Sequence, residues 1–359
     1  MIEWLPTIWF LLLGVLLIGY AILDGFDLGV GIMHLTAKSD RERRVYMNAI
    51  GPLWDGNEVW LVTFGGALFA AFPDAYATVF SGFYLALMLV LLCLILRAVS
   101  LEFRSKTKSA LWRRVWDWGF FGSSFGAALL FGVAVGNSLV GMPIQADGGF
   151  GDLGAFDMLF YQLSQPFGYL VGLMTVVMFA MHGTIYLYLK TEGETRERLV
   201  PWMWRTYFAF IAMFLLTNVW TFAFVDQAFN NFRDHWWLAI VPILAFLAIL
   251  NISRAIKKGN APVAFVSSCC TIAAFCFMYF AALFPNLVVS TIDVSAVAPA
   301  AFEAGDRSFN LTIENAASSS DTLRNMFIIA CMGLPFVFAY SAVIYWTFWG
   351  KVQLGEHSY

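Results

Sequence analysis

Two short groups of acidic residues are the part of the sequence best suited to chemistry. Asp24 and Asp27 stand three residues apart in an otherwise apolar stretch, and Asp55 and Glu58 repeat that spacing in the next stretch. Side chains three residues apart share one face of a helix. Two carboxyl groups that close cannot both ionise without a proton, a cation or a basic partner. Ionisable residues inside a membrane span indicate a functional pathway, so these acids could bind a cation or carry protons.

A third charged group, Arg97, Glu102 and Lys106, follows the third apolar stretch. Glu102 and Lys106 are four residues apart, in the order that favours an ion pair on a helix. A structural interpretation stays open for all three groups. Acids in the first turn of a helix complement its dipole, Glu102 and Lys106 could form an ordinary surface pair, and Glu58 is expected to be a solvated or packing residue.

The composition shows what kind of protein must position these groups. The 359 residues are 60% hydrophobic and only 13% charged, with a mean hydropathy of +0.72. Soluble domains average about 25% charged residues, and a soluble chain this long needs a charged surface. The composition therefore indicates a polytopic membrane protein and excludes a soluble enzyme, a disordered chain and a nucleic-acid-binding protein.

A span needs about 20 mostly apolar residues, and the chain offers nine such stretches. The sequence therefore predicts an all-α, single integral membrane domain over residues 1–359, arranged as two four-helix bundles plus one extra helix. Residues 285–325 are expected to form a long outer surface loop. The expected spans lie near 6–33, 50–72, 76–96, 116–140, 166–189, 203–225, 236–253, 262–284 and 326–349.

The basic residues predict the orientation. Every Lys and Arg except Arg233, Arg307 and Arg324 follows an odd-numbered span, and Arg97 is counted in the loop after the third. Because cytoplasmic loops carry the excess of Lys and Arg, the N-terminus is expected outside and the C-terminus in the cytoplasm. The acidic groups then lie towards the cytoplasmic side.

Histidines and cysteines are few. His182 is the one histidine within an expected span, and it is predicted to be a hydrogen-bonded core residue. Membrane haems take mainly His or Met ligands, so this chain could not supply several bis-histidine sites. The five cysteines are expected to pack in the core, Asp117 between two tryptophans to lie at the membrane surface, and His34 to be cytoplasmic.

Several sequence blocks resemble subunit II of the cytochrome bd quinol oxidases. The blocks run from the glycine-rich acidic segment of the first span to the end of the fourth span; beyond about residue 190 the likeness is mostly topological, until the last three residues. They are residues 19–31, 54–61, 65–73, 80–84, 104–106, 116–119, 132–137 and 357–359.

The resemblance implies a subunit of a respiratory terminal oxidase in the bacterial inner membrane, which oxidises quinol and reduces oxygen to water without pumping. It implies a partner, subunit I, that carries the quinol site, two b-type haems and one haem d. This chain would support that partner, contribute to proton uptake and carry no haem itself. Small accessory single-span subunits and membrane lipids are further partners, and a structural quinone in this chain is left open.

The resemblance also assigns residues. Asp55 matches the family acid on a cytoplasmic proton route, Glu102 falls where the family can carry Asp, and Lys106 matches a basic residue of the same route. Asp24 and Asp27 match an acid pair associated with a bound cation or a second proton route.

The chain's last two residues, Ser358 and Tyr359, resemble a tail that folds back towards the acid pair. Glu58 stands where the family also accepts Gln, so it is not expected to be required.

Two rival functions stay open. In an ion-coupled secondary transporter the same acids would bind a coupling ion, although they lie towards one face here. In a purely structural subunit they would only anchor a partner.

Overall fold

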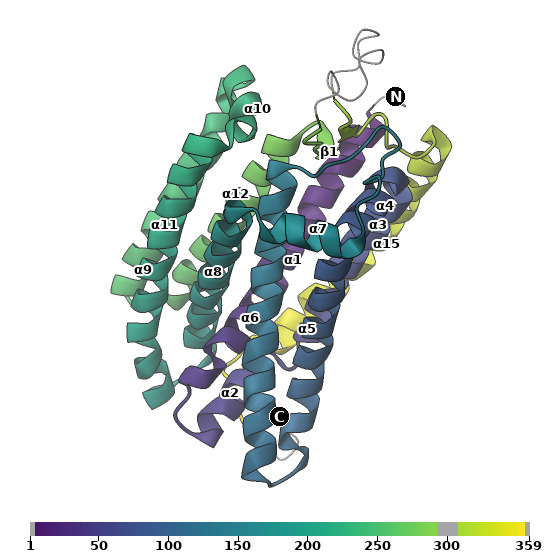
Figure 1. The fold of residues 1–359 in the computed structure, drawn as a ribbon. Helices are drawn as coiled ribbons and strands as arrows, with labels where there is room; N and C mark the ends of the chain where they lie inside the picture. Colours follow the sequence, from purple (N-terminus) through teal and green to yellow (C-terminus); the bar gives the residue numbers. More distant parts are fainter. Residues whose placement is uncertain (1–3, 293–307, 356–359) are drawn as a thin grey trace.

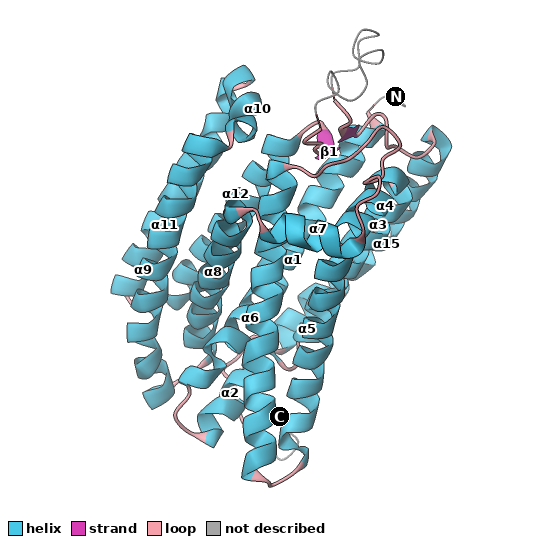
Figure 2. Ribbon diagram, viewed as in Figure 1, coloured by secondary structure: helices cyan, strands magenta, loops and turns pink. Residues whose placement is uncertain are grey.

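Helices make up most of the computed structural model, which describes residues 4–292 and 308–355 (Figure 2). Proline in the first turn begins α4, α8 and α12, and Ser39, Ser109 and Ser319 cap α2, α6 and α15. The helices are α1 (Leu5–Met33), α2 (Asp40–Ile50), α3 (Trp54–Ala71), α4 (Pro73–Gly82), α5 (Tyr84–Phe103), α6 (Ala110–Val140), α7 (Ala155–Leu163), α8 (Pro166–Lys190), α9 (Gly193–Phe224), α10 (Asn230–Asp234), α11 (Ile240–Lys257), α12 (Ala261–Leu283) and α15 (Ser320–Thr347).

Eight helices of the described chain are long and apolar enough to cross a membrane: α1, α5, α6, α8, α9, α11, α12 and α15. The all-α, multi-pass architecture is therefore confirmed. The second expected span corresponds to α3, which does not reach this apolarity because Asp55, Asn57 and Glu58 occupy its first turns. The count of nine spans stays a prediction.

The third expected span, 76–96, is wrong in its boundaries. Pro73 begins a separate short helix, α4, that ends at Gly82, and α5 then continues to Phe103. Arg97 is consequently a buried residue in the last two turns of α5 and not a loop residue. Helix α9 likewise begins ten residues before its expected start, because charged residues form its first turns.

Helix α1 lies at the centre of the fold and packs against α3, α6, α8 and α12 (Figure 1). Its glycines allow the closest of these contacts, because Gly29 and Gly183 face each other where α1 meets α8 and no Cβ atom fits between them. Helix α15 contacts α1 and α3 and leaves most of its apolar surface exposed.

Most basic loops gather at one end of the molecule. Helix α2, the α5–α6 turn and the α8–α9 turn lie at this end, which we call the basic end, and α1 begins at the opposite end (Figure 1). At the basic end, two lysines form hydrogen bonds that hold the segment after α15 against the end of α8. Lys190 donates to the carbonyl oxygens of Phe348 and Gly350, and Lys351 donates to those of Leu189 and Thr191.

The expected outer loop 285–325 is only in part a surface connection. Strands β1 (Asn286–Val288) and β2 (Leu311–Thr312) pair antiparallel, and α15 begins at Ser320, within the expected loop. Ser318 donates from its backbone nitrogen to the carbonyl oxygen of Ala71, 2.8 Å away. The described part of this segment therefore packs on the end of α3, since Val288 and Ala316 are buried.

The close contact between α1 and α8 predicts that one methyl group added at this contact lowers the stability of the protein. The Cβ atom in Gly183→Ala would lie 2.6 Å from the Cα atom of Gly29, so the two helices must separate. We expect a loss of about 3 kcal/mol and a clearly lower melting temperature of the detergent-purified assembly that contains the chain. The control Gly122→Ala meets nothing within 4 Å and should change stability little. Equal melting temperatures for both variants would contradict this account of the packing.

Candidate functional site

The acid pair on α1 is fully buried. Asp24 and Asp27 are both 0% exposed, and they point from the same face of α1 towards α3 and α5, where their partners lie. A buried carboxylate needs a charged or hydrogen-bonded partner to stay ionised. The partners of these two acids therefore decide what the site can do.

Arg97 of α5 is the cationic partner. Its Nη1 atom donates to Oδ1 of Asp24 over 2.6 Å, and its Nη2 atom donates to Oε1 of Glu58. The Arg97 side chain is 0% exposed, whereas that of Glu58 is 25% exposed. One guanidinium thus joins a buried carboxylate of α1 to a partly exposed carboxylate of α3. The expectation that Glu58 is merely solvated or packing is wrong.

Asp27 has neutral partners. Asn57 donates from Nδ2 to Oδ2 of Asp27 over 2.8 Å, and its Oδ1 atom accepts a 2.8 Å hydrogen bond from the hydroxyl of Tyr345. The amide also donates to the carbonyl oxygen of Leu23. This chain of contacts holds α1, α3 and α15 together around Asp27.

The charges of this cluster do not balance. We call Asp24, Asp27, Glu58 and Arg97 the acid cluster; it holds three carboxyl groups and one guanidinium. Oδ2 of Asp24 and Oδ1 of Asp27 are buried and accept no hydrogen bond from any described residue. The cluster therefore has room for a proton or a cation on these oxygens.

A metal ion would find few ligands here. Over residues 4–292 and 308–355, no three His, Cys, Asp or Glu side chains are placed to share a metal ion. Ser358 and Tyr359, which the resemblance brings towards the acid pair, lie outside the described residues. The described chemistry thus suits protons at least as well as a cation.

The residues of the expected proton route come from the start of α3 and from the end of α5. Asp55 is exposed in the first turn of α3, Glu102 is half-buried near the end of α5, and Lys106 is exposed in the short turn after it. Glu102 and Lys106 do not share one α-helix, because α5 ends at Phe103 and Lys106 lies in the turn that follows. All three nevertheless lie at or near the basic end.

A second buried ion cluster at the basic end surrounds Asp117 of α6. Oδ1 of Asp117 lies 2.6 Å from both His34 Nε2 and Arg104 Nε, and its Oδ2 atom lies 2.7 Å from Arg43 Nη1. Arg104 also pairs with Asp40 at the start of α2. This cluster joins the ends of α1, α2, α5 and α6. Both residues are buried, because Asp117 is 1% exposed and His34 is 0% exposed. Whether they lie at the membrane surface and on the cytoplasmic side stays a prediction.

His182 is a hydrogen-bonded core residue, as predicted. Its Nδ1 atom lies 2.7 Å from the Ser268 hydroxyl and its Nε2 atom lies 3.1 Å from the carbonyl oxygen of Ile22. The ring stacks on Phe265 at 5.0 Å. Both ring nitrogens are engaged, so the ring offers no free ligand to a metal.

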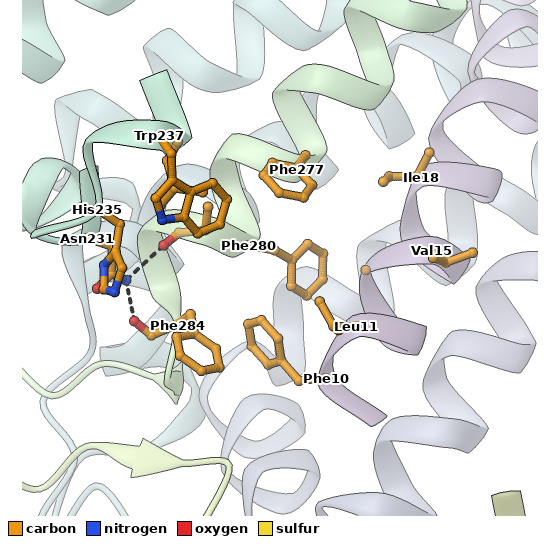
Figure 3. A pocket seen from close by; sticks show the side chains of 13 residues that line it. Phe10, Leu11, Val15, Ile18, Asn231, His235, Trp237, Phe277, Phe280 and Phe284 are labelled. Atoms are coloured by element: carbon orange, nitrogen blue, oxygen red, sulfur yellow. Dashed lines mark hydrogen bonds between the residues drawn. The ribbon is translucent and has the colours of Figure 1, made fainter. Parts of the chain in front are cut away.

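An apolar pocket of about 320 Å³ lies between the first half of α1 and α12 (Figure 3). Aromatic rings of Phe10, Phe280, Phe284 and Trp237 line it, and Asn231 turns its amide away to bond backbone carbonyl oxygens of α12 and the following residue. Apart from Asn231 and His235, the lining is aliphatic and aromatic, which suits a hydrocarbon group.

The sequence alone does not reveal the partners that link the acids. Arg97 was assigned to a loop, and Asn57 and Tyr345 were assigned no role. One signal was available for Arg97, since it is the charge that directly ends the apolar run of residues 84–96. Tyr345 gave none, because a tyrosine near a helix end is typical of the membrane interface.

Comparisons with known proteins agree with this architecture. The family model described as cytochrome bd terminal oxidase subunit II matches residues 5–348. The chain is 36% identical to cytochrome bd-I ubiquinol oxidase subunit 2 of Escherichia coli (strain K12), over 98% of this chain and 96% of that protein. It is 32% identical to cytochrome bd ubiquinol oxidase subunit 2 of Bacillus subtilis (strain 168), over 98% of both chains.

A solved structure shares the fold. A chain in the structure of bd oxidase from Geobacillus thermodenitrificans superimposes with a TM-score of 0.74 at 15% sequence identity, covering 97% of this chain and 99% of that one. The match of the family model over almost the whole chain and the identity to two curated relatives agree. This chain belongs to the cytochrome bd terminal oxidase subunit II family.

Proposed function

We propose that this chain supports the haem-bearing subunit I of a cytochrome bd-type quinol oxidase and supplies protons from the basic end for the reduction of oxygen to water. Family membership makes the chain part of a quinol oxidase complex in the bacterial inner membrane, with subunit I as partner, haems in the complex and quinol as substrate. The proposal also assigns two b-type haems and one haem d to subunit I. The observation that carries it is the under-compensated acid cluster between α1, α3 and α5.

The chemistry requires such a path. Reducing oxygen to water consumes protons, and the hydrocarbon interior of a membrane supplies none. Ionisable groups can carry protons through it when they are buried against protein rather than lipid. Asp55 is exposed in the first turn of α3, and Glu58 lies one turn further along the same face. In this route Asp55 takes up the proton at the basic end, and Glu102 and Lys106 line the entrance.

The arrangement in the membrane is part of the same proposal. The chain crosses nine times as a single integral domain, with α3 as the second span, the N-terminus outside and the basic end in the cytoplasm. Helices α1, α3, α5 and α6 form one bundle, α8, α9, α11 and α12 the second, and α15 is the extra helix. The exposed apolar faces of α3 and α15 support a large partner on that side, because Val62, Phe69 and Phe336 are exposed there.

The acid pair of α1 has a second role in this proposal. Asp24 and Asp27, with Ser358 and Tyr359 of the tail, hold a cation or form a second proton route. Two buried acceptor oxygens without a partner among the described residues support this. Quinol, membrane lipids and small single-span accessory subunits complete the partners. A transporter is no longer favoured, because the relatives that match the whole chain are oxidase subunits.

The first prediction concerns Asp55. In the purified complex, Asp55→Asn removes the ionisable group at the entrance but keeps the size of the side chain. We expect quinol-driven oxygen consumption to fall at least about tenfold, while the haem absorption spectrum of the complex persists. Asp321→Asn changes another exposed acid, at the opposite end, and should leave the rate unchanged. Normal turnover in a fully assembled Asp55→Asn complex would remove Asp55 from the route.

The second prediction concerns the supporting role. Arg97→Gln leaves the buried Asp24 and the partly exposed Glu58 without their cation, and uncompensated buried charge destabilises by about 3–5 kcal/mol. We expect little assembled complex, measured as haem per membrane protein. The exposed Arg114→Gln should assemble normally, and Asp24→Asn combined with Arg97→Gln should recover part of the yield. Full assembly of Arg97→Gln alone would contradict the proposed importance of this cation.

A further inference from the structure

The three carboxyl groups of the acid cluster differ sharply in their access to the surface. The Asp24 and Asp27 side chains are completely buried, whereas the Glu58 side chain is 25% exposed. We propose that Glu58 is the residue through which protons reach the buried Asp24 and Asp27, held in place by Arg97. This inference rests on the proposed proton uptake by this chain and adds a proton-carrying residue to it.

Arg97 sets the geometry of the transfer. Its two terminal nitrogens bind Asp24 and Glu58, so a single planar group lies between the surface acid and the buried one. A guanidinium stays protonated in proteins and cannot itself pass a proton on. Arg97 therefore acts as a fixed positive charge that keeps both carboxyl groups within reach of each other.

The step conserves protons and charge. An incoming proton binds a carboxylate oxygen of Glu58, forms the neutral carboxylic acid and weakens the ion pair with Nη2 of Arg97. The proton then moves to Oδ2 of Asp24 or Oδ1 of Asp27, the two buried acceptors that no described residue occupies. Glu58 returns to the carboxylate form and pairs with Arg97 again. No electron moves in this step.

Asp27 also contacts the side chain of Asn57, which is neutral. Asn57 donates to Asp27 with its amide nitrogen and accepts from Tyr345 with its amide oxygen. A side-chain amide does not take up and release protons near neutral pH, so this chain of contacts positions Asp27 and does not carry protons to it. Asn57 is also 2% exposed. Within the described structure, Glu58 is thus the one acid that connects the cluster with the exposed face of α3.

The test uses the complete oxidase complex with Glu58→Gln. Glutamine has the same length, and its side-chain oxygen can still accept from Arg97, so the size and one hydrogen bond are kept while the negative charge and the ability to bind a proton are lost. Proton uptake during a single round of oxygen reduction is followed with a pH-indicator dye, and carboxyl bands are followed by redox-difference infrared spectroscopy. Glu194→Gln, an exposed glutamate at the same end of the molecule, is the matched control.

We expect Glu58→Gln to slow proton uptake at least about tenfold and to remove a carboxyl band, with haem content and spectra unchanged. The control should match the native complex. Native uptake and an unchanged infrared spectrum in Glu58→Gln would overturn the inference. If Asp55→Asn is slow in the same assay, the proposed function then stands without Glu58; if Asp55→Asn is also native, both fail.

A second variant covers the case in which Glu58→Gln does not assemble. Glu58→Asp keeps the charge and the ion pair on a shorter stem. If the side chain at position 58 takes up the proton, the carboxyl band shifts in frequency in this variant. A band at the native frequency would overturn the inference.

Discussion

The acid cluster depends on one constraint: a guanidinium buried inside an apolar bundle must be matched by anions from its neighbours. Arg97 is 0% exposed in α5, and the anions come from α1 through Asp24 and from α3 through Glu58. A buried charge that loses its partner destabilises strongly, so this pairing fixes how the three helices lie relative to one another. Asn57, one residue before Glu58, then meets Asp27 and Tyr345 and adds α15 to the assembly.

The two buried ion clusters differ in their charge balance, and the difference suggests different roles. Asp117 receives contacts from His34, Arg43 and Arg104, so its charge is more than compensated. That cluster joins the helix ends, and both carboxylate oxygens of Asp117 are engaged. In the acid cluster one guanidinium serves three carboxyl groups, and two buried oxygens lack a donor among the described residues. A cluster with more carboxyl groups than cations can take up a proton and still keep the ion pairs that hold its helices together.

Hydropathy and the distribution of basic residues were sufficient to predict an all-α membrane protein and the approximate place of every long helix. They could not locate helix ends that depend on distant partners. Arg97 reads as the charge that stops a span, yet α5 continues past it because Asp24 and Glu58 compensate the charge from other helices. The break between α4 and α5 at Gly82 was missed for a related reason, since the segment stays apolar on both sides.

The candidate site was predictable to the level of its acids. The three-residue spacing of Asp24 and Asp27 and of Asp55 and Glu58 correctly indicated shared faces. Local spacing carries no information on which faces meet, and so it did not reveal that Glu58 and Asp24 share Arg97. For the same reason His34 and Asp117, 83 residues apart, could not be paired from the sequence.

The most direct test of the central claim, that the acid cluster is supplied with protons from the basic end, is a high-resolution electron cryo-microscopy map of the assembled oxidase. The account predicts ordered waters that connect the acid cluster to the aqueous surface at the basic end, passing Glu58. A cluster sealed from that surface, or connected only to the opposite end, would contradict it.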